Sequence, residues 1–320
     1  MFKKVVKQKP LNYISILYIM QNSKVRESRI KSAVKKIMPF GMQKFLYKNI
    51  IKKARNAKLS VQKKITKDDV KKELIKSGLK NGDAVIVHSS LSRIGFLENG
   101  AATLIDAFLE VVGKDGLLVM PAFSALNYDE KKKMYIFDVN KTPAYTGAVP
   151  EAFRKRKGVL RSTSPTHSLI AKGKKAKWFV EGHDKCDNPY GKEGPFYNLL
   201  ELDAKIFLIG VDQLANSSIH IVEDKYKNFL IKVWTEKQKV FVKYKDGNKK
   251  IIYARWHLPH LYKIRDNNIL EKYFLKESLM KLHKFFNTEL RIIKVRDVAD
   301  CMERLAKKNI TIYNPKNQVN

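Results

Sequence analysis

Apolar runs of strand length alternate with segments of helical periodicity from residue 66 onward. The apolar runs have the near-continuous hydrophobicity of strands buried on both faces. The predicted strands are residues 83–90, 117–123 and 205–211. The predicted helices are residues 66–78, 100–116, 217–230 and 267–286. This alternation predicts an α/β fold in which helices flank a central sheet.

Local sequence signals support these segments. Thr66 with Asp69 three residues later is a capping-box pattern, and Gly78 is a typical helix stop. Residues 239–255 are predicted to form two strands joined at Asp246-Gly247, a hairpin sequence. The hairpin predicts a mixed sheet, and the C-terminal part alternates strand, helix and short strand.

Residues 1–65 differ in composition from the rest of the chain. They hold 18 Lys+Arg and one acid, so their net charge of +17 is about half of the total of +33. Apolar residues recur among the lysines of residues 29–58, which predicts two short basic amphipathic helices. Such helices could lie on an anionic membrane, pack as an arm on the main domain, or bind nucleic acid. We predict a basic helical extension over 1–65 and a domain over 66–320.

The cysteine content and the hydropathy of the sequence indicate in which cellular compartment the protein works. Cys186 and Cys301 are far apart and belong to no CxxC pair, which argues against a disulfide framework or a thiolate zinc site. The apolar residues 10–20 are fewer than the about 20 that a membrane-spanning helix needs. The sequence therefore predicts a cytoplasmic protein, with residues 1–65 as a candidate contact to the inner membrane face.

Polar residues gather where the first predicted strand ends. His88, Ser89 and Ser90 end the strand, and Ser92 lies in the following loop. Hydroxyl and backbone N–H groups at such a strand end can bind the phosphates of a cofactor. The spacing matches neither GxGxxG nor GxxxxGK[ST], so an ordinary turn with a structural histidine is an open alternative.

A histidine and a glutamate share one turn after the strand 205–211. Asn216 or Ser217 could cap the helix that follows, which puts His220 in its first turn. The positive helix end disfavours imidazolium there and keeps a neutral base available. Glu223 lies one turn further, near enough to orient the ring. A structural histidine beside a solvated glutamate is the alternative.

Three stretches carry motifs of one known family, in the same order. GDAVIVHSSLSRIGFLENGAATLIDAFLEVVGKDGLLVMPAF resembles a pattern G-D-x-V-x-V-H-S-S-L followed by I-G, G-A and V-M-P. LRSTSPTHSLIAKGKKA resembles R-S-x-x-P-x-x-S-x-x-A-x-G-x-x-A, and ANSSIHIVE resembles N-T-x-x-H-x-x-E. Over residues 66 to 265 the chain thus resembles the aminoglycoside 3-N-acetyltransferase family.

This resemblance implies an acetyl-CoA-dependent N-acetyltransferase domain over 66–320. It implies the YokD-like acyltransferase fold, an α/β fold distinct from the commoner GNAT fold. His220 matches the general base of the family, and Ser217 stands where Thr is frequent and could supply an oxyanion donor. The predicted coenzyme A contacts are Ser89, Ser90, Ser92, Arg161 and Ser168. The predicted acceptor contacts are His88, Ser124 and His257.

The chain departs from the family after the hairpin. Members active on aminoglycosides carry carboxylates there, whereas residues 253–260, YARWHLPH, contain no acid. Glu223 or another acid could take over their role. His257 and His260 are candidate acceptor contacts or ordinary loop residues, and no metal is predicted because further ligands are missing.

Charge guides the prediction of the acceptor. A chain of net charge +33 repels a polycationic aminoglycoside and attracts an amine on a nucleotide diphosphate or lipid pyrophosphate. The leading hypothesis is therefore acetylation of an amino sugar on an anionic carrier in bacterial surface polysaccharide biosynthesis, with no nucleic-acid partner. The alternatives are antibiotic modification, and a non-catalytic basic binding protein on the same scaffold.

Overall fold

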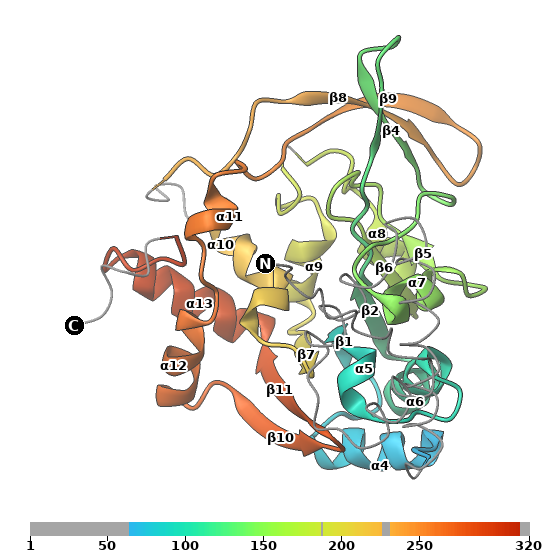
Figure 1. Cartoon of the computed structure of the whole chain (residues 1–320), viewed down its shortest axis with the longest axis vertical. Helices are drawn as coiled ribbons and strands as arrows, with labels where there is room; N and C mark the ends of the chain where they lie inside the picture. Colours follow the sequence, from blue (N-terminus) through green and yellow to red (C-terminus); the bar gives the residue numbers. More distant parts are fainter. Residues whose placement is uncertain (1–63, 187, 226–230, 314–320) are drawn as a thin grey trace, which may run out of the picture. The chain divides into compact units, whose positions relative to one another are not determined.

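A mixed seven-stranded sheet forms the centre of the fold, with strand order β10-β11-β7-β1-β2-β6-β5 (Figure 1). The structure is a computed structural model that describes residues 64–186, 188–225 and 231–313. The predicted helical extension and its membrane contact lie outside these ranges, apart from the last two residues of the extension. None of the helices in the described ranges is long and apolar enough to cross a membrane.

The predicted apolar runs form the three parallel strands of this sheet. They are β1 (Ala84–Ser89), β2 (Leu117–Pro121) and β7 (Lys205–Ile209). Antiparallel strands extend the sheet on both sides: β11 (Thr288–Lys294) and β10 (Lys281–Phe285) beyond β7, and β6 (Leu169–Gly173) and β5 (Leu160–Arg161) beyond β2. These antiparallel neighbours make the sheet mixed.

Successive side chains of the strands point to opposite faces, and helices bury each face in a separate core. In β1, Val85 and Val87 join one core and Ile86 the other. The Val85 face is covered by α4 (Lys67–Lys76), α5 (Leu91–Ile94), α6 (Ala101–Val112) and α7 (Ala148–Arg154). The Ile86 face is covered by α8 (Ala176–Val180), α9 (Pro195–Glu201), η2 (Ser217–Ile221), α10 (Val222–Lys225), α11 (Leu261–Ile264), α12 (Ile269–Lys276) and α13 (Val295–Ala306). The predicted α/β fold with a central mixed sheet flanked by helices is confirmed.

The predicted hairpin exists but lies in a different sheet. Its strands β8 (Gln238–Lys243) and β9 (Lys249–Ala254) pair with each other. β8 also pairs with β4 (Met134–Asp138), which pairs with β3 (Asn127–Asp129). This second sheet has a small core of its own around Phe137. The prediction that the hairpin makes the central sheet mixed is therefore wrong, because its apolar residues are buried against β4 instead.

Two helix predictions need correction. The predicted helix 267–286 ends after Lys276, because Ser278 adopts the left-handed conformation with φ 54°, and its second half becomes β10. Antiparallel pairing with β11 overrides the helical periodicity there. The segment 217–230 is the 3-10 helix η2 followed by the short α10, and residues 226–230 lie outside the described ranges. The short strand predicted after the last helix does not form up to residue 313.

We expect Gly173→Ala to destabilise the protein more than Gly247→Ala. Both glycines have positive φ, which costs an L-residue about 1–2 kcal/mol. A Cβ at Gly173 would also lie 2.1 Å from the Gly116 carbonyl oxygen, whereas one at Gly247 meets nothing within 4 Å. Urea unfolding of the two variants measures the difference, and equal losses would contradict this account of the β2–β6 contact.

Candidate active site

His220 lies in the 3-10 helix η2, rather than in the first turn of an α-helix as predicted. Asn216 caps η2 by accepting a hydrogen bond from the Ser218 N–H at 3.1 Å. Ile219 and Ile221, on either side of His220, are buried in the core of this sheet face. These contacts fix the backbone of His220, whose side chain is 5% exposed.

Glu223 is a buried carboxylate that accepts hydrogen bonds from three side chains. Its Oε1 accepts from Nδ1 of His220 at 2.7 Å and from the hydroxyl of Tyr313. Its Oε2 accepts from Nε2 of His257 at 2.8 Å. Burial acts to raise the pKa of Glu223, but the neighbouring imidazoles of His220 and His257 outweigh it and hold the pKa below its usual range. Glu223 is therefore ionised at neutral pH.

The ionised Glu223 sets the tautomer of His220. A carboxylate only accepts hydrogen bonds, so Nδ1 of His220 carries the proton and the neutral ring has its lone pair on Nε2. Burial lowers the pKa of His220 to about 4, with His257 and Arg265 acting in the same direction and Glu223 opposing them. The ring is the neutral base that the sequence suggested, but burial rather than the helix end is the main reason.

The base nitrogen of His220 is covered by a guanidinium group. Nη1 of Arg265 lies 3.1 Å from Nε2 of His220, where it donates a hydrogen bond to the lone pair. These side chains form a cluster with aromatic rings around it, and the cluster consists of His220, Glu223, His257, Tyr313, Arg265 and Tyr190. The Tyr190 ring lies 5.3 Å from the His220 ring, and Trp234 stacks on His257 at 4.3 Å between ring centroids. The surroundings of His220 are thus polar and aromatic rather than aliphatic.

His220, Glu223 and His257 also offer potential metal ligands within 4.8 Å of one another. Their N···O distances of 2.7 and 2.8 Å are shorter than the about 3.3 Å between ligands in a tetrahedral zinc site with bonds of about 2.0–2.1 Å. The arrangement as it stands is a set of hydrogen bonds. The absence of a metal from the reaction stays a prediction.

The serines predicted to contact coenzyme A lie at the carboxyl end of β1. Ser89 ends the strand, and the N–H of Ser90 donates to the carbonyl of Ile209 at 2.9 Å, which ties the loop to β7. Ser89 and Ser90 are half-buried, and Ser92 is exposed. Their role in binding coenzyme A stays a prediction.

Some buried polar atoms have no hydrogen-bond partner among the described residues. They include Nε2 of His88 and the hydroxyls of Ser217 and Ser218. Burial lowers the pKa of His88 to about 3, so its ring is neutral. A buried polar atom without a partner is costly, so a ligand that supplies partners would be favoured. His88 and Ser217 therefore stay candidates for acceptor binding and for the oxyanion donor.

Arg161, Ser168 and Ser124 contact one another and the backbone. Arg161 donates from Nε to the Ser168 hydroxyl at 2.9 Å and from Nη2 to the Ser124 hydroxyl at 2.6 Å. Its other donors reach the carbonyls of Ala122, Val139 and Thr142. All five N–H groups of the guanidinium are thus used within the protein. This network connects β5 to the loops after β2 and β4, and the ligand contacts predicted for these residues stay predictions.

We expect Arg161→Met to lower the free energy of unfolding by about 3–5 kcal/mol, because it leaves several buried carbonyls without donors at a cost of about 1–3 kcal/mol each. Arg156→Met is the matched control. Arg156 pairs with Asp106 at 26% and 43% side-chain exposure, so its loss costs about 1 kcal/mol or less. Urea unfolding gives both values. A stable Arg161→Met protein with weakened coenzyme A binding would contradict this structural role and support the predicted cofactor contact.

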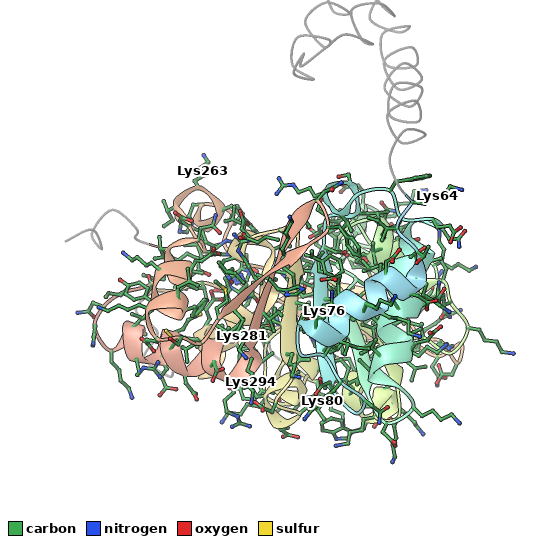
Figure 2. All side chains as sticks on the ribbon, turned by 90° about the horizontal axis from the view of Figure 1, so that it is seen from below. Lys64, Lys76, Lys80, Lys263, Lys281 and Lys294 are labelled. Atoms are coloured by element: carbon green, nitrogen blue, oxygen red, sulfur yellow. The ribbon has the colours of Figure 1, made fainter. Side chains whose placement is uncertain are left out.

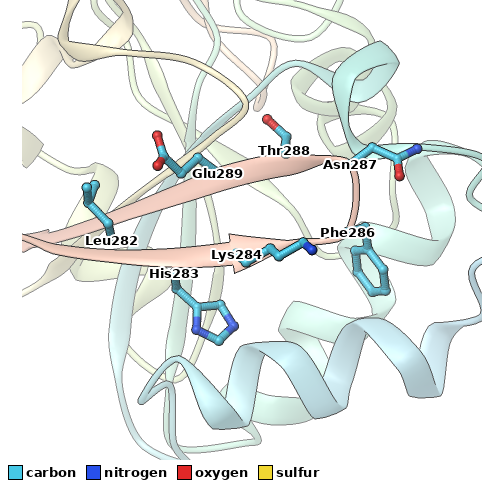
Figure 3. Close-up of a pocket in the computed structure, with 7 residues that line it drawn as sticks. All are labelled: Leu282, His283, Lys284, Phe286, Asn287, Thr288 and Glu289. Carbon is cyan, nitrogen blue, oxygen red and sulfur yellow. The ribbon is translucent and has the colours of Figure 1, made fainter.

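A hollow of about 650 Å³ lies on the β10–β11 hairpin (Figure 3). Its lining includes His283, whose Nε2 bonds to the carboxylate of Glu73 at 3.0 Å and so joins the hairpin to α4. The lining residues run from Leu282 to Glu289 and include none of the His220 cluster. The hollow is therefore separate from the candidate active site.

Three members of the cluster were not predicted from the sequence. Tyr313, Arg265 and Tyr190 lie far from His220 in the chain and in no local motif. Of the residues after the hairpin, His257 was predicted as an acceptor contact, whereas the structure places it against Glu223. The lack of an acid in residues 253–260 was the available signal that this segment contributes differently here.

The fold is shared with solved acetyltransferase structures. A structure described as "AAC-IIIb binary with CoASH" has a TM-score of 0.69 at 22% identity and covers 78% of this chain and 98% of its own. The crystal structure of YokD from Bacillus subtilis has a TM-score of 0.65 at 24% identity and covers 82% and 97%. The fold is thus the YokD-like α/β fold, as predicted.

The chain belongs to the aminoglycoside 3-N-acetyltransferase family, whose pattern matches residues 86–307. The SPbeta prophage-derived aminoglycoside N(3')-acetyltransferase-like protein YokD of Bacillus subtilis (strain 168) is 31% identical over 176 residues, which are 49% of this chain and 64% of that protein. Aminoglycoside N(3)-acetyltransferase IX of Micromonospora chalcea is 30% identical over 174 residues, 50% and 62% of the two chains. The chain spans slightly less than two thirds of these relatives' length.

Proposed function

We propose that the protein is an acetyl-CoA-dependent N-acetyltransferase with His220 as the general base. The observation that carries the proposal is the neutral, buried His220 ring, with Nδ1 held by Glu223 at 2.7 Å and a lone pair on Nε2. Membership of a family of N-acetyltransferases supports it, and so does the neighbouring structure described with CoASH.

In the proposed reaction, the acceptor amine attacks the thioester carbonyl of acetyl-CoA. A C–N bond forms, the C–S bond breaks, and coenzyme A leaves as the thiol after receiving a proton. Nε2 of His220 takes the proton from the amine, and the charge of Glu223 stabilises the imidazolium that results. His257 and Tyr313 hold Glu223 in place through their hydrogen bonds.

Ser217 is the proposed oxyanion donor, and Ser89, Ser90 and Ser92 are the proposed contacts to coenzyme A. Ser217 lies three residues before His220 in η2, and its buried hydroxyl has no partner among the described residues. Such a hydroxyl can donate to a negative charge that develops in the transition state. Ser89 pairs with Ile209 of β7 and the N–H of Ser90 donates to its carbonyl, so these two serines border the strand that leads into η2.

The proposal for the acceptor has a general part, a sugar-like amine, and two narrower alternatives. A sugar-like amine is common to both acceptor hypotheses. The names of the relatives favour an aminoglycoside, and none of them points to the amino sugar on an anionic carrier or to polysaccharide biosynthesis. The observation in favour of an anionic acceptor is positive charge: the chain carries +33, and lysines project from the described domain in Figure 2. Coenzyme A release, measured with one acceptor of each class, tests these alternatives.

We expect His220→Asn to lower kcat/KM by about 10²–10⁴-fold, because it removes the general base. His283→Asn is the matched control, since His283 lies on the β10–β11 hairpin, separate from the candidate active site. The measurement is coenzyme A release from acetyl-CoA with a responsive acceptor, and circular dichroism checks that both variants fold. An unchanged rate in His220→Asn would exclude this mechanism.

The pH dependence should have its acidic limb near pH 4 rather than near 6.5. Burial lowers the pKa of His220 to about 4, so the base loses activity through protonation only when the pH falls to that value. The same lowered pKa means that the unfolded state binds more protons between pH 6.5 and 4, so stability falls as the pH decreases through this window. A profile of kcat/KM from pH 4 to 8 measures the limb, and a midpoint near 6.5 would speak against a buried base.

A further inference from the structure

Arg265 is placed at the one atom of His220 that the proposed reaction needs free. It follows α11, and its Nη1 lies 3.1 Å from Nε2 of His220. The guanidinium donates to the lone pair that has to accept a proton from the acceptor amine. An amine and Arg265 cannot occupy this position together, so Arg265 has to move when an acceptor binds.

Within the described part of the chain, few contacts hold the guanidinium of Arg265 in this position. It forms no ion pair with any carboxylate among the residues whose side chains the structure describes. Its contacts are the bond to His220 and the face of Tyr262, whose centroid lies 5.1 Å from Cζ. Glu223 is fully engaged by His220, His257 and Tyr313. With respect to the described side chains, Arg265 is therefore a half-buried cation whose remaining N–H donors are available to an anion.

Planar N–H donors of arginine suit the oxygens of phosphoryl and carboxylate groups. An additional cation beside the base repels an acceptor that is itself a polycation. An acceptor with an anionic group near its amine gains a partner in Arg265 and draws the guanidinium away from the imidazole. The same contact would therefore recognise the acceptor and uncover the base.

We propose that Arg265 is a specificity-determining residue that binds an anionic group of the acceptor and thereby releases Nε2 of His220 for the amine. The inference rests on the proposed function and narrows its substrate class to amines that carry a phosphoryl or carboxylate group. In this proposal Arg265 selects the acceptor and uncovers Nε2 of His220, while His220 accepts the proton.

The test compares acceptors that differ in one group. Glucosamine is the neutral reference, glucosamine 6-phosphate adds a phosphoryl group and muramic acid adds a carboxylate. We expect the chain to prefer at least one anionic acceptor over glucosamine by about 10–100-fold in kcat/KM, as for a hydrogen bond between charged groups. In Arg265→Gln this preference should fall to about twofold or less. For an aminoglycoside, used as the fourth acceptor, kcat/KM should be higher in Arg265→Gln than in the parent protein.

Lys263→Gln is the matched control. It removes the same charge two residues away, from an exposed side chain at the surface of the described domain (Figure 2). We expect it to keep the acceptor preference. Arg265→Lys keeps the charge without the planar donors and should keep part of the preference. Equal preference in the parent, Arg265→Gln and Lys263→Gln proteins, or an equal loss in both Gln variants, would overturn the proposal.

A second measurement does not depend on catalysis. Nitrogen-15 NMR of His220 should show Nε2 shifting when glucosamine 6-phosphate is added to the parent protein and to Lys263→Gln, and no such shift in Arg265→Gln. A shift without acetyl transfer to any amine would support the role of Arg265 and reject the proposed function. Acetyl transfer with no difference between Arg265→Gln and the parent would support the proposed function and reject the role of Arg265.

Discussion

One buried carboxylate determines the arrangement of the candidate active site. Glu223 accepts hydrogen bonds from His220 in η2, His257 after the second sheet and Tyr313 near the end of the described chain. An ionised carboxylate is costly to bury unless such donors surround it. The same bonds that offset this cost bring three distant segments together and orient the imidazole of His220. The hydrogen bonds that stabilise the buried charge of Glu223 are therefore the same ones that fix the geometry of the base.

The central sheet supplies the rigid support for this carboxylate. The parallel strands β1, β2 and β7 are buried on both faces, and η2 follows β7 with its apolar residues in the core on the Ile86 face. Because α13 also packs on this face and touches η2, Tyr313, which follows α13, reaches Glu223. The backbone of His220 is therefore positioned by apolar packing, and its ring by hydrogen bonds.

What could be predicted from the sequence was mostly local. The strands around Ile86 and Phe207 and the capped helix after Thr66 follow from apolar runs and end signals within a few residues. The pair His220 and Glu223 lies within one turn, so its contact was also foreseeable. By contrast, the pairing of β10 with the adjacent β11 was concealed by a helical periodicity in residues 267–286, and the second sheet depends on pairing between the distant strands β4 and β8. The contacts of Arg161 were missed for the same reason, since its partners lie on three different loops.

The net charge of the chain and the charges beside His220 act on the acceptor at different distances. The total of +33 includes residues 1–65 with about half of it, so it describes the surroundings of the protein better than its active site. At the base, the decisive groups are the anion of Glu223, which is fully hydrogen-bonded, and the cation of Arg265, which has no ion-pair partner among the described side chains. Because His220, His257 and Tyr313 already donate to the oxygens of Glu223, an incoming acceptor meets mainly the guanidinium of Arg265. Discrimination between cationic and anionic amines would therefore arise within a few ångströms of Nε2 of His220, largely independent of the lysines on the surface.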